Sequence, residues 1–206
     1  LTTAQFRAMS DAQIAQLTPE QGAAIELTDL VTFTPGQITA MTATQLQALT
    51  TAQVAQLTTA QIVAIETADL ATLGTAQIAA LGTAQVRAMG TIQLAALTSE
   101  QIQAIETVDI AAMTTAQIAA IEAADLAQTT AQIDKLTPDQ IAALTTTQLR
   151  AIEDQDLVLL TAPQIAALSS VQLGSLSTSQ IERLTTAQVA AIEAGHMAGL
   201  STAQVV

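Results

Sequence analysis

The chain has 206 residues, of which half are apolar and only 1% are aromatic, and it contains no cysteine. Without cysteine it can form neither disulfides nor thiolate metal sites. Its net charge is −13, with only five Lys and Arg residues in total, so it offers no clustered cations for nucleic acid or for an anionic membrane surface. We therefore expect no nucleic-acid partner, and no membrane insertion because no apolar run is long enough to span a bilayer.

The whole chain repeats with a period of eight residues. Cutting it before Leu1, Met9, Leu17 and so on gives 26 octapeptides with the consensus L-T-T-A-Q-I-A-A. Positions 1 and 6 are each apolar in 25 octapeptides, and position 5 is Gln in 20. The register slips once, after Ala127, and resumes at Gln128. We predict a single octapeptide-repeat array over residues 1–206, with the slip near 127–128 as its one candidate kink.

Two regular structures do not fit this period. Eight residues overshoot two helical turns by about 80°, so the apolar stripe of one continuous helix would face no single partner. Pro19, Pro35 and Pro138 at position 3 would also break such a helix. In a β-strand, positions 1 and 6 would point to opposite faces, and the abundant alanine disfavours strands.

A short helix in every octapeptide does fit. Position 2 is Thr, Ser or Gly in 20 octapeptides, and the Gln at position 5 completes a capping box. Position 3 then becomes the first helical residue, where proline is favoured, and Pro163 at position 4 still lies in the first turn. Such helices cannot be stable alone and must stack. We predict an all-α solenoid of very short helices, one per octapeptide.

Six octapeptides depart from the consensus in a coordinated way. In each, Ile at position 1 is followed by Glu at position 2, and position 5 is Asp or, once, His. In chain order, the three positions are Ile25, Glu26 and Asp29; Ile65, Glu66 and Asp69; Ile105, Glu106 and Asp109; Ile121, Glu122 and Asp125; Ile152, Glu153 and Asp156; and Ile192, Glu193 and His196.

The favoured explanation is a second way to cap the helix. Asp would lie in the first turn, where the helix dipole favours negative charge, and the longer Glu would reach a neighbouring octapeptide. The alternative is weak Ca²⁺ binding by stacked carboxylates. The recurrence at intervals of 40 residues suggests that five octapeptides make a whole number of superhelical turns, which would place Glu26, Glu66 and Glu106 in one row.

No residue set indicates a reaction. His196, the only histidine, has no partner for a metal site or a triad, and we interpret it as a neutral or capping residue. Glu153, Asp154 and Asp156 are interpreted as a charged, solvated edge rather than an acid–base site. We therefore predict that the protein is not an enzyme, with no catalytic, cofactor-binding or metal-binding residues and no cofactor.

The octapeptides "LTTAQVAQ", "LTTAQIVA", "LGTAQIAA" and "IETADLAT" resemble the tandem octapeptide tracts of very large bacterial exported proteins, which are described as adhesin-like or surface repeat proteins. This resemblance implies an extracellular or cell-surface structural role and brings no catalytic residues. "LTPEQGAAI" and "LTPDQIAAL" also look like the opening of transcription-activator-like effector repeats, but those repeats are about four times longer and carry basic residues absent here.

We therefore expect a structural protein: an acidic stalk, spacer or filament subunit that is secreted or displayed on the cell surface. Because Leu1 and Val206 show no polar capping octapeptide, we also expect self-association, end to end or side by side. The alternative is a solenoid binding module that recognises a peptide, a glycan or cations through one face. Departures from consensus at positions 7 and 8, such as Arg7, Arg87 and Arg150, are too sparse to indicate a groove.

Overall fold

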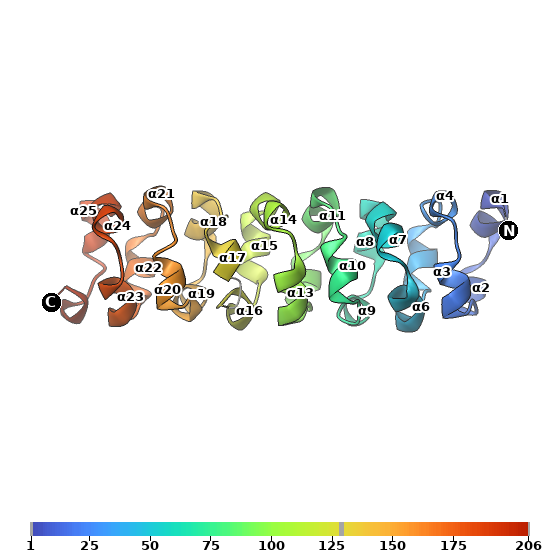
Figure 1. The fold of residues 1–206 in the computed structure, drawn as a ribbon, viewed down its shortest axis with the longest axis horizontal. Helices are drawn as coiled ribbons and strands as arrows, with labels where there is room; N and C mark the ends of the chain where they lie inside the picture. Colours follow the sequence, from blue (N-terminus) through green and yellow to red (C-terminus); the bar gives the residue numbers. More distant parts are fainter. Residues whose placement is uncertain (1, 128–129, 206) are drawn as a thin grey trace. The chain divides into compact units, whose positions relative to one another are not determined.

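The computed structural model describes residues 2–127 and 130–205, and all regular secondary structure in these ranges is helical (Figure 1). Each octapeptide forms one helix of four to six residues or, at the end, a single 3₁₀ turn. The predicted all-α solenoid of very short helices is confirmed. The predicted kink at the register slip lies outside the described residues.

The chain forms two compact units, residues 1–109 (unit 1) and residues 110–206 (unit 2). The helices up to the end of unit 1 are α1 (Thr3–Ala8), α2 (Asp11–Ala15), α3 (Pro19–Ala23), α4 (Leu27–Leu30), α5 (Pro35–Thr39), α6 (Ala43–Ala48), α7 (Thr51–Gln56), α8 (Thr59–Ala64), α9 (Thr67–Leu70), α10 (Thr75–Ala79), α11 (Thr83–Ala88), α12 (Thr91–Ala95), α13 (Ser99–Ala104) and α14 (Thr107–Ala112). Those that follow are α15 (Thr115–Ala120), α16 (Ala123–Ala127), α17 (Thr130–Ile133), α18 (Pro138–Ala143), α19 (Thr146–Ala151), α20 (Asp154–Leu157), α21 (Ala162–Ala166), α22 (Ser170–Ser175), α23 (Thr178–Glu182), α24 (Thr186–Ala191), α25 (Ala194–Met197) and the 3₁₀ turn η1 (Thr202–Gln204).

The helices begin as the sequence predicts. In α8, the Thr58 hydroxyl accepts a hydrogen bond from the Gln61 N–H at 3.2 Å, and the Thr58 N–H donates to Gln61 Oε1 at 2.8 Å. This reciprocal pair satisfies two backbone N–H groups at a helix end that has no preceding turn. Pro19, Pro35 and Pro138 occupy the first helical position, where a missing N–H costs nothing.

The helices end without left-handed residues. Ile65, which follows α8, adopts φ −68° and ψ 125° and donates its N–H to the carbonyl of Ile62. No residue in the described ranges has a positive φ. The chain therefore reverses through two extended residues, positions 1 and 2, and needs no glycine at this turn.

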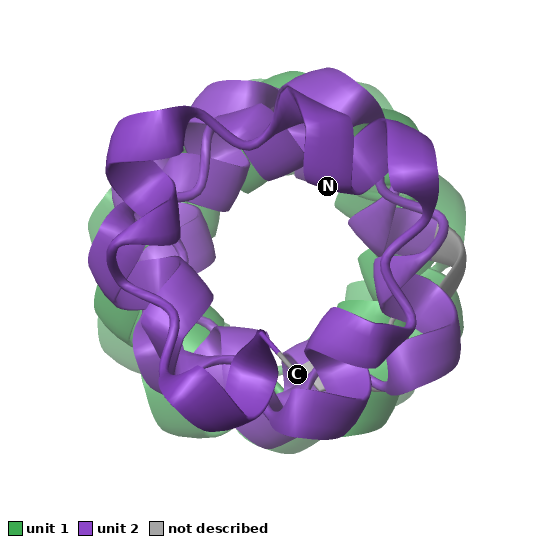
Figure 2. Ribbon diagram, turned by 90° about the vertical axis from the view of Figure 1, so that its left-hand side faces the viewer, with its two compact units in different colours: residues 1–109 green, residues 110–206 purple. Residues whose placement is uncertain are grey.

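The core consists of the aliphatic residues at positions 1 and 6. In α8 and the residue after it, Ile62 is 0% and Ile65 is 2% exposed, and this pattern holds through the interior octapeptides. The rings of Phe6 and Phe33 lie 5.8 Å apart, so position 6 of the first octapeptide packs against position 1 of the fifth. In unit 2, the helices surround a common axis (Figure 2). The apolar side chains of each octapeptide are thus buried against residues about one turn of the solenoid away.

Helices three octapeptides apart lie against each other within each unit. In unit 1, α3 contacts α6, α5 contacts α8, and α10 contacts α13; in unit 2, α18 contacts α21 and α21 contacts α24. Helices this short obtain their stability from such stacking rather than from their own hydrogen bonds. In the described part of the chain, every helix is too short to cross a lipid bilayer.

Candidate functional site

The glutamine at position 5 links successive turns of the solenoid. Gln61 accepts the Thr58 N–H through Oε1, and its Nε2 donates to the carbonyls of Leu30 at 2.8 Å and Phe33 at 3.0 Å. The side chain is 1% exposed. One amide therefore caps its own helix and satisfies two carbonyls of the preceding turn, and its polar groups are paired despite complete burial.

This arrangement recurs along both units. The glutamines whose amide nitrogen donates to a pair of carbonyls in the preceding turn are Gln37, Gln45, Gln53, Gln61, Gln77, Gln85, Gln93, Gln101, Gln140, Gln148, Gln164, Gln172, Gln180, Gln188 and Gln204. We call this set the glutamine ladder. In unit 1 its bonds reach back 28 and 31 residues, so one turn contains between three and four octapeptides.

The ladder also registers the one-residue slip. In unit 2, Gln140 and Gln148 reach back 27 and 30 residues instead of 28 and 31. From Gln172 onward the spacing is again 28 and 31. Gln140 and Gln148 still contact carbonyls at positions 6 and 1, whereas Gln164 contacts those of Asp134 and Leu136, at positions 7 and 1. The side-chain bonds to the preceding turn are therefore kept, with one change of acceptor.

The predicted row of Glu26, Glu66 and Glu106 is wrong. With three to four octapeptides per turn, five octapeptides do not make a whole number of turns. Within unit 1, α4 and α9, which follow Glu26 and Glu66, lie at opposite edges of the ribbon (Figure 1). The recurrence at 40 residues therefore has another origin.

The aspartates of the variant octapeptides bond to a different group. Thr3 Oγ1 donates to Asp29 Oδ1 at 2.5 Å, and Thr83 Oγ1 donates to Asp109 Oδ1 at 2.5 Å. Each threonine is at position 3, three octapeptides earlier. A carboxylate accepts but cannot donate, so Asp accepts a hydrogen bond from a hydroxyl at the position where Gln would donate its N–H groups to carbonyls. Asp69 differs, since the equivalent residue is Ala43, which has no hydroxyl.

The glutamates predicted to reach a neighbouring octapeptide lie at the surface of the stack. Glu26 and Glu66 are exposed and make no capping hydrogen bond. Glu153 accepts from Gln155 Nε2 at 2.7 Å within its own octapeptide. The contact with the neighbour is made by the shorter Asp, because position 5 points into the stack and position 2 lies at its surface.

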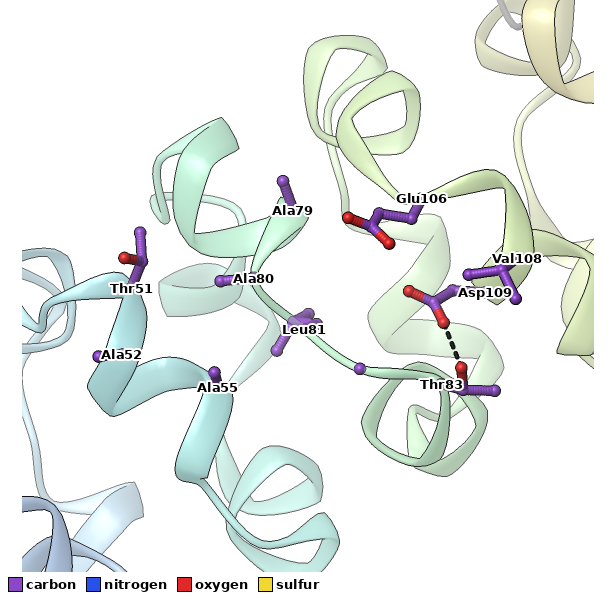
Figure 3. Close-up of a pocket in the computed structure, with 11 residues that line it drawn as sticks. Thr51, Ala52, Ala55, Ala79, Ala80, Leu81, Thr83, Glu106, Val108 and Asp109 are labelled. Carbon is purple, nitrogen blue, oxygen red and sulfur yellow. Dashed lines mark hydrogen bonds between the residues drawn. The ribbon is translucent and has the colours of Figure 1, made fainter.

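A pocket of about 530 Å³ lies in unit 1 beside the variant octapeptide of Asp109. Glu106 and Asp109 face the segment from Ala79 to Leu81, and Thr83 bonds to Asp109 (Figure 3). By the spacing of the ladder, a glutamine at residue 109 would donate to the carbonyls of Ile78 and Leu81. The shorter aspartate leaves the space that this amide fills elsewhere.

The chemistry of this pocket is limited. It offers two carboxylates, the hydroxyls of Thr51 and Thr83, and the methyl groups of several alanines. Across the part of the chain that the structure describes, no three or more His, Cys, Asp or Glu side chains gather as a metal site. Weak Ca²⁺ binding therefore stays a prediction. The arrangement fits a small cation or an amine better than an anion.

The remaining residues singled out from the sequence are separated. Asp156 is 2% exposed, so the prediction of a solvated edge is wrong for this residue, whereas Glu153 is exposed as expected. The Ser179 hydroxyl donates to Asp154. His196 Nδ1 is buried and finds no hydrogen-bond partner among the described residues, so His196 has no capping bond there. These groups do not converge on a common centre.

Two exposed glutamates outside these octapeptides have a lowered pKa. Glu20 and Glu100 both lie in the first turn of a helix, and a hydrogen bond from the residue's own backbone N–H lowers the pKa of each. The hydroxyls of Thr18 and Thr98 lower it further. This is the preference of a helix N-terminus for negative charge.

The glutamine ladder was not predicted from the sequence, although one signal for it is present there. A capping box accepts Glu as well as Gln at its third helical position, yet Glu never occurs at position 5. The strict choice of an amide indicates that a donor is needed as well as an acceptor. Only the fold reveals that the acceptors lie 28 and 31 residues away.

The chain is a tandem-repeat protein of the helical solenoid class: its short helices stack in successive turns, and buried glutamines join each turn to the one before it. The chain belongs to the ALTTAQ repeat family, which matches residues 22–59, 62–99, 102–146 and 149–186. A search of curated proteins finds no match. Each matched segment begins three residues before the isoleucine of a variant octapeptide, Ile25, Ile65, Ile105 or Ile152. The first three segments begin 40 residues apart, which is a longer sequence repeat of five octapeptides, and the fourth begins 47 residues after the third.

Proposed function

We propose that the protein is a structural element, a stalk, spacer or filament subunit of a large bacterial surface or adhesin-like protein. The observation that carries the proposal is the recurrence of the glutamine ladder, in which position 5 glutamines from Gln37 to Gln204 bond to carbonyls of the preceding turn, with interruptions at the variant octapeptides. A polymer of nearly equal steps is suited to setting a distance. No catalytic role is proposed.

The ladder supplies a mechanism for this role. Each octapeptide adds two aliphatic side chains to the core and one amide that bonds to the preceding turn. Stability is then close to a sum of nearest-neighbour terms, so the length of the array can change without a new fold. Three or four amides per turn would share a load applied along the axis. The charge of −13 keeps copies apart in dilute solution.

The test of the structural role is a series of longer chains. Variants that carry residues 25–64 two or three times extend the array by one or two blocks of five octapeptides. Small-angle scattering should show equal increments in the maximum dimension and an unchanged cross-section. An inserted block that thickens the particle, or one that unfolds, would contradict a spacer built from equivalent steps.

The surface location needs its own experiment. In the native organism, an antibody against the chain should label intact cells, and external protease should remove the label. Labelling that appears only after lysis would overturn the extracellular assignment. It would leave the scattering result, and hence the structural role, in place.

The second candidate function is a binding module, which the pocket beside Asp109 favours. Its ligand would be a cation or an amine-bearing peptide or glycan, since carboxylates and hydroxyls line the pocket. A calcium titration followed by thermal melting separates the two functions. A calcium-dependent rise in Tm that the Asp109→Asn variant lacks would support binding. No shift in Tm at millimolar calcium would exclude a calcium-binding function.

A further inference from the structure

One amide of the glutamine ladder is missing inside unit 1. Residue 109 is an aspartate, so the Nε2 atom that would donate to the carbonyls of Ile78 and Leu81 is absent. Leu81 is 4% exposed, and its carbonyl accepts no hydrogen bond from any described residue. The equivalent carbonyl of Phe33 is bonded by Gln61 Nε2 at 3.0 Å. Because backbone carbonyls of buried residues are nearly always paired, this one indicates a donor that the described chain does not supply.

The carbonyl of Ile78 is a second acceptor. It accepts the Leu81 N–H at 3.1 Å, just as the carbonyl of Leu30 accepts the Phe33 N–H at 3.1 Å. The carbonyl of Leu30 nevertheless also accepts from Gln61 Nε2 at 2.8 Å, because a carbonyl oxygen has two lone pairs. One lone pair of the Ile78 carbonyl is therefore available to a donor in the place of the missing amide.

The third acceptor is Asp109 itself. Its side chain is 2% exposed, and Oδ1 accepts the Thr83 hydroxyl at 2.5 Å. The other oxygen, Oδ2, accepts from no described residue, and Figure 3 shows it turned toward the segment from Ala79 to Leu81. A buried carboxylate oxygen thus faces the pocket of about 530 Å³ without a donor. We call the place of the missing amide, between the carbonyls of Ile78 and Leu81 and Asp109 Oδ2, the ladder gap.

These three acceptors define the chemistry of a ligand. It must donate several hydrogen bonds, and it must be positive, since Glu106 and Asp109 supply two carboxylates and none of the residues that line the pocket is cationic. A primary ammonium group meets both conditions, with three N–H donors and one positive charge. A calcium ion fits less well, because it takes about six to eight oxygen ligands, more than face the ladder gap.

We propose that the ladder gap binds a primary ammonium group, which donates to the carbonyls of Ile78 and Leu81 and to Asp109 Oδ2 in place of the missing glutamine amide. The ligand class is an alkylamine, as a free amine or as the side chain of a lysine. The inference rests on the second candidate function, the binding module, and names the ligand class of its pocket. Glu106, beside the gap, adds attraction for the cation.

Glycine resonances test the proposal at the site itself. Glycine-selective ¹⁵N labelling of the full chain leaves eight resonances, and a Gly82→Ala variant assigns the one whose peptide group contains the Leu81 carbonyl. Titration with butylammonium should shift the Gly82 resonance to saturation and leave that of Gly22, in α3, in place. Trimethylbutylammonium carries the same charge without an N–H group, so its dissociation constant should be about tenfold higher or more.

Restoring the glutamine gives the matched variant. Asp109→Gln supplies the missing amide and fills the ladder gap from within the chain. A position 3 threonine three octapeptides earlier is compatible with glutamine, since Thr51 precedes Gln77 in this way. The variant should melt at a higher temperature than the wild type, and butylammonium should no longer move its Gly82 resonance. Because the variant gains stability, its loss of binding cannot result from unfolding.

A charge-matched control separates the ladder gap from the overall charge. Glu20→Gln also removes one negative charge, at an exposed residue that does not line the pocket, and it should bind butylammonium like the wild type. Diaminobutane and Nα-acetyl-lysine amide then distinguish the two sources of the ammonium group. Tighter binding of the first indicates a free amine, and tighter binding of the second indicates a lysine side chain.

Three results would overturn the proposal. They are a Gly82 resonance that no primary amine moves, equal binding of trimethylbutylammonium, and binding that Asp109→Gln weakens no more than Glu20→Gln does. None of them would bear on the calcium titration or on the length increments. Failure of the ammonium site is therefore distinguishable from failure of either proposed function.

Discussion

At position 5, one choice of residue decides how an octapeptide joins the turn before it. Gln61 donates two hydrogen bonds to backbone carbonyls, whereas Asp109 receives one from the Thr83 hydroxyl. Both side chains are buried, so each must find its partner inside the stack. The change from Gln to Asp therefore exchanges a backbone contact for a contact with position 3, three octapeptides earlier.

Removing the Thr83 hydroxyl should show how much the stability depends on its hydrogen bond to Asp109. The Thr83→Val variant keeps the volume but removes the hydroxyl that donates to Asp109, and we expect a loss of about 1–3 kcal/mol in the free energy of unfolding. Urea denaturation followed by circular dichroism measures it. In the opposite direction, Ala43→Thr supplies a hydroxyl to Asp69 and should add about 0.5–1.5 kcal/mol. Ala43→Val is the matched control, and an equal gain from it would show that the hydroxyl is irrelevant.

At the scale of the element, each helix depends on its two ends because it has almost no middle. The first four backbone N–H groups of any helix have no partner within it. In a helix of four to six residues these are most of its N–H groups, so the capping residues satisfy a larger share than in a longer helix. Three successive helices, α10, α11 and α12, have Gly74, Gly82 and Gly90 as N-cap residues and lack a hydroxyl cap, although the glutamine half of the capping box is present. Glycine is itself a favourable N-cap residue, so the missing hydroxyl bond weakens these helix starts by only about a few tenths of a kcal/mol.

Restoring a hydroxyl should strengthen them. Gly74 has extended dihedral angles that any residue adopts, and a Cβ there meets no atom closer than 3.8 Å. We expect Gly74→Thr to stabilise the protein by about 0.5–1.5 kcal/mol, through the new cap and through the lower entropy of the unfolded chain. The shift in the midpoint of urea denaturation tests this. Gly74→Ala should recover only the entropic part, and equality of the two variants would exclude the cap.

Two kinds of glycine site lie near the end of unit 2. A Cβ on Gly199 would collide with the backbone of Ser170, and one on Gly174 would collide with the backbone of Gly199, so the backbone segments approach closely there. A Cβ on Gly195, in α25, would meet no atom within 4 Å. The same substitution should therefore act differently at the two sites.

The measurement is a comparison of thermal melts. Gly199→Ala should destabilise the protein by about 1–3 kcal/mol because backbone must shift to admit the methyl group. Gly195→Ala should stabilise it by about 0.5–1 kcal/mol, the difference in helix propensity. Destabilisation by both substitutions to the same extent would mean that close packing does not distinguish the sites.

The sequence predicted the elements well because their signals are local. Capping residues, the proline at the first helical position and the apolar positions all act within eight residues, so Thr58 and Gln61 could be assigned to their capping roles without the fold. The bonds from Gln61 Nε2 could not be predicted in this way, because their acceptors, the carbonyls of Leu30 and Phe33, are distant in sequence. The number of octapeptides per turn depends on that distance, which explains the error over Glu26, Glu66 and Glu106.

At the scale of the molecule, each octapeptide that contributes to the glutamine ladder buries one polar side-chain amide. An amide that is fully paired costs little when buried, whereas the same site with one group unpaired costs the full desolvation of that group. Interior glutamines should thus be far more sensitive to substitution than Gln5, Gln13 and Gln21, which are exposed in the first turn. The place of the octapeptide in the stack, rather than the place of the residue in its octapeptide, decides how much a substitution destabilises the protein.

Replacing single glutamines with glutamate tests this contrast. In Gln61→Glu the carboxylate faces the carbonyls of Leu30 and Phe33 and cannot donate to them, so we expect a loss of about 2–5 kcal/mol at neutral pH. Burial beside carbonyl oxygens raises the pKa of the introduced carboxyl group in the folded state. Its protonated form can donate, so the loss should shrink as the pH falls through that raised pKa. Gln13→Glu, in the exposed first turn, should change the stability by less than about 0.5 kcal/mol at any pH. Equal effects at residues 13 and 61 in urea denaturation at pH 7 would show that the ladder does not stabilise the stack.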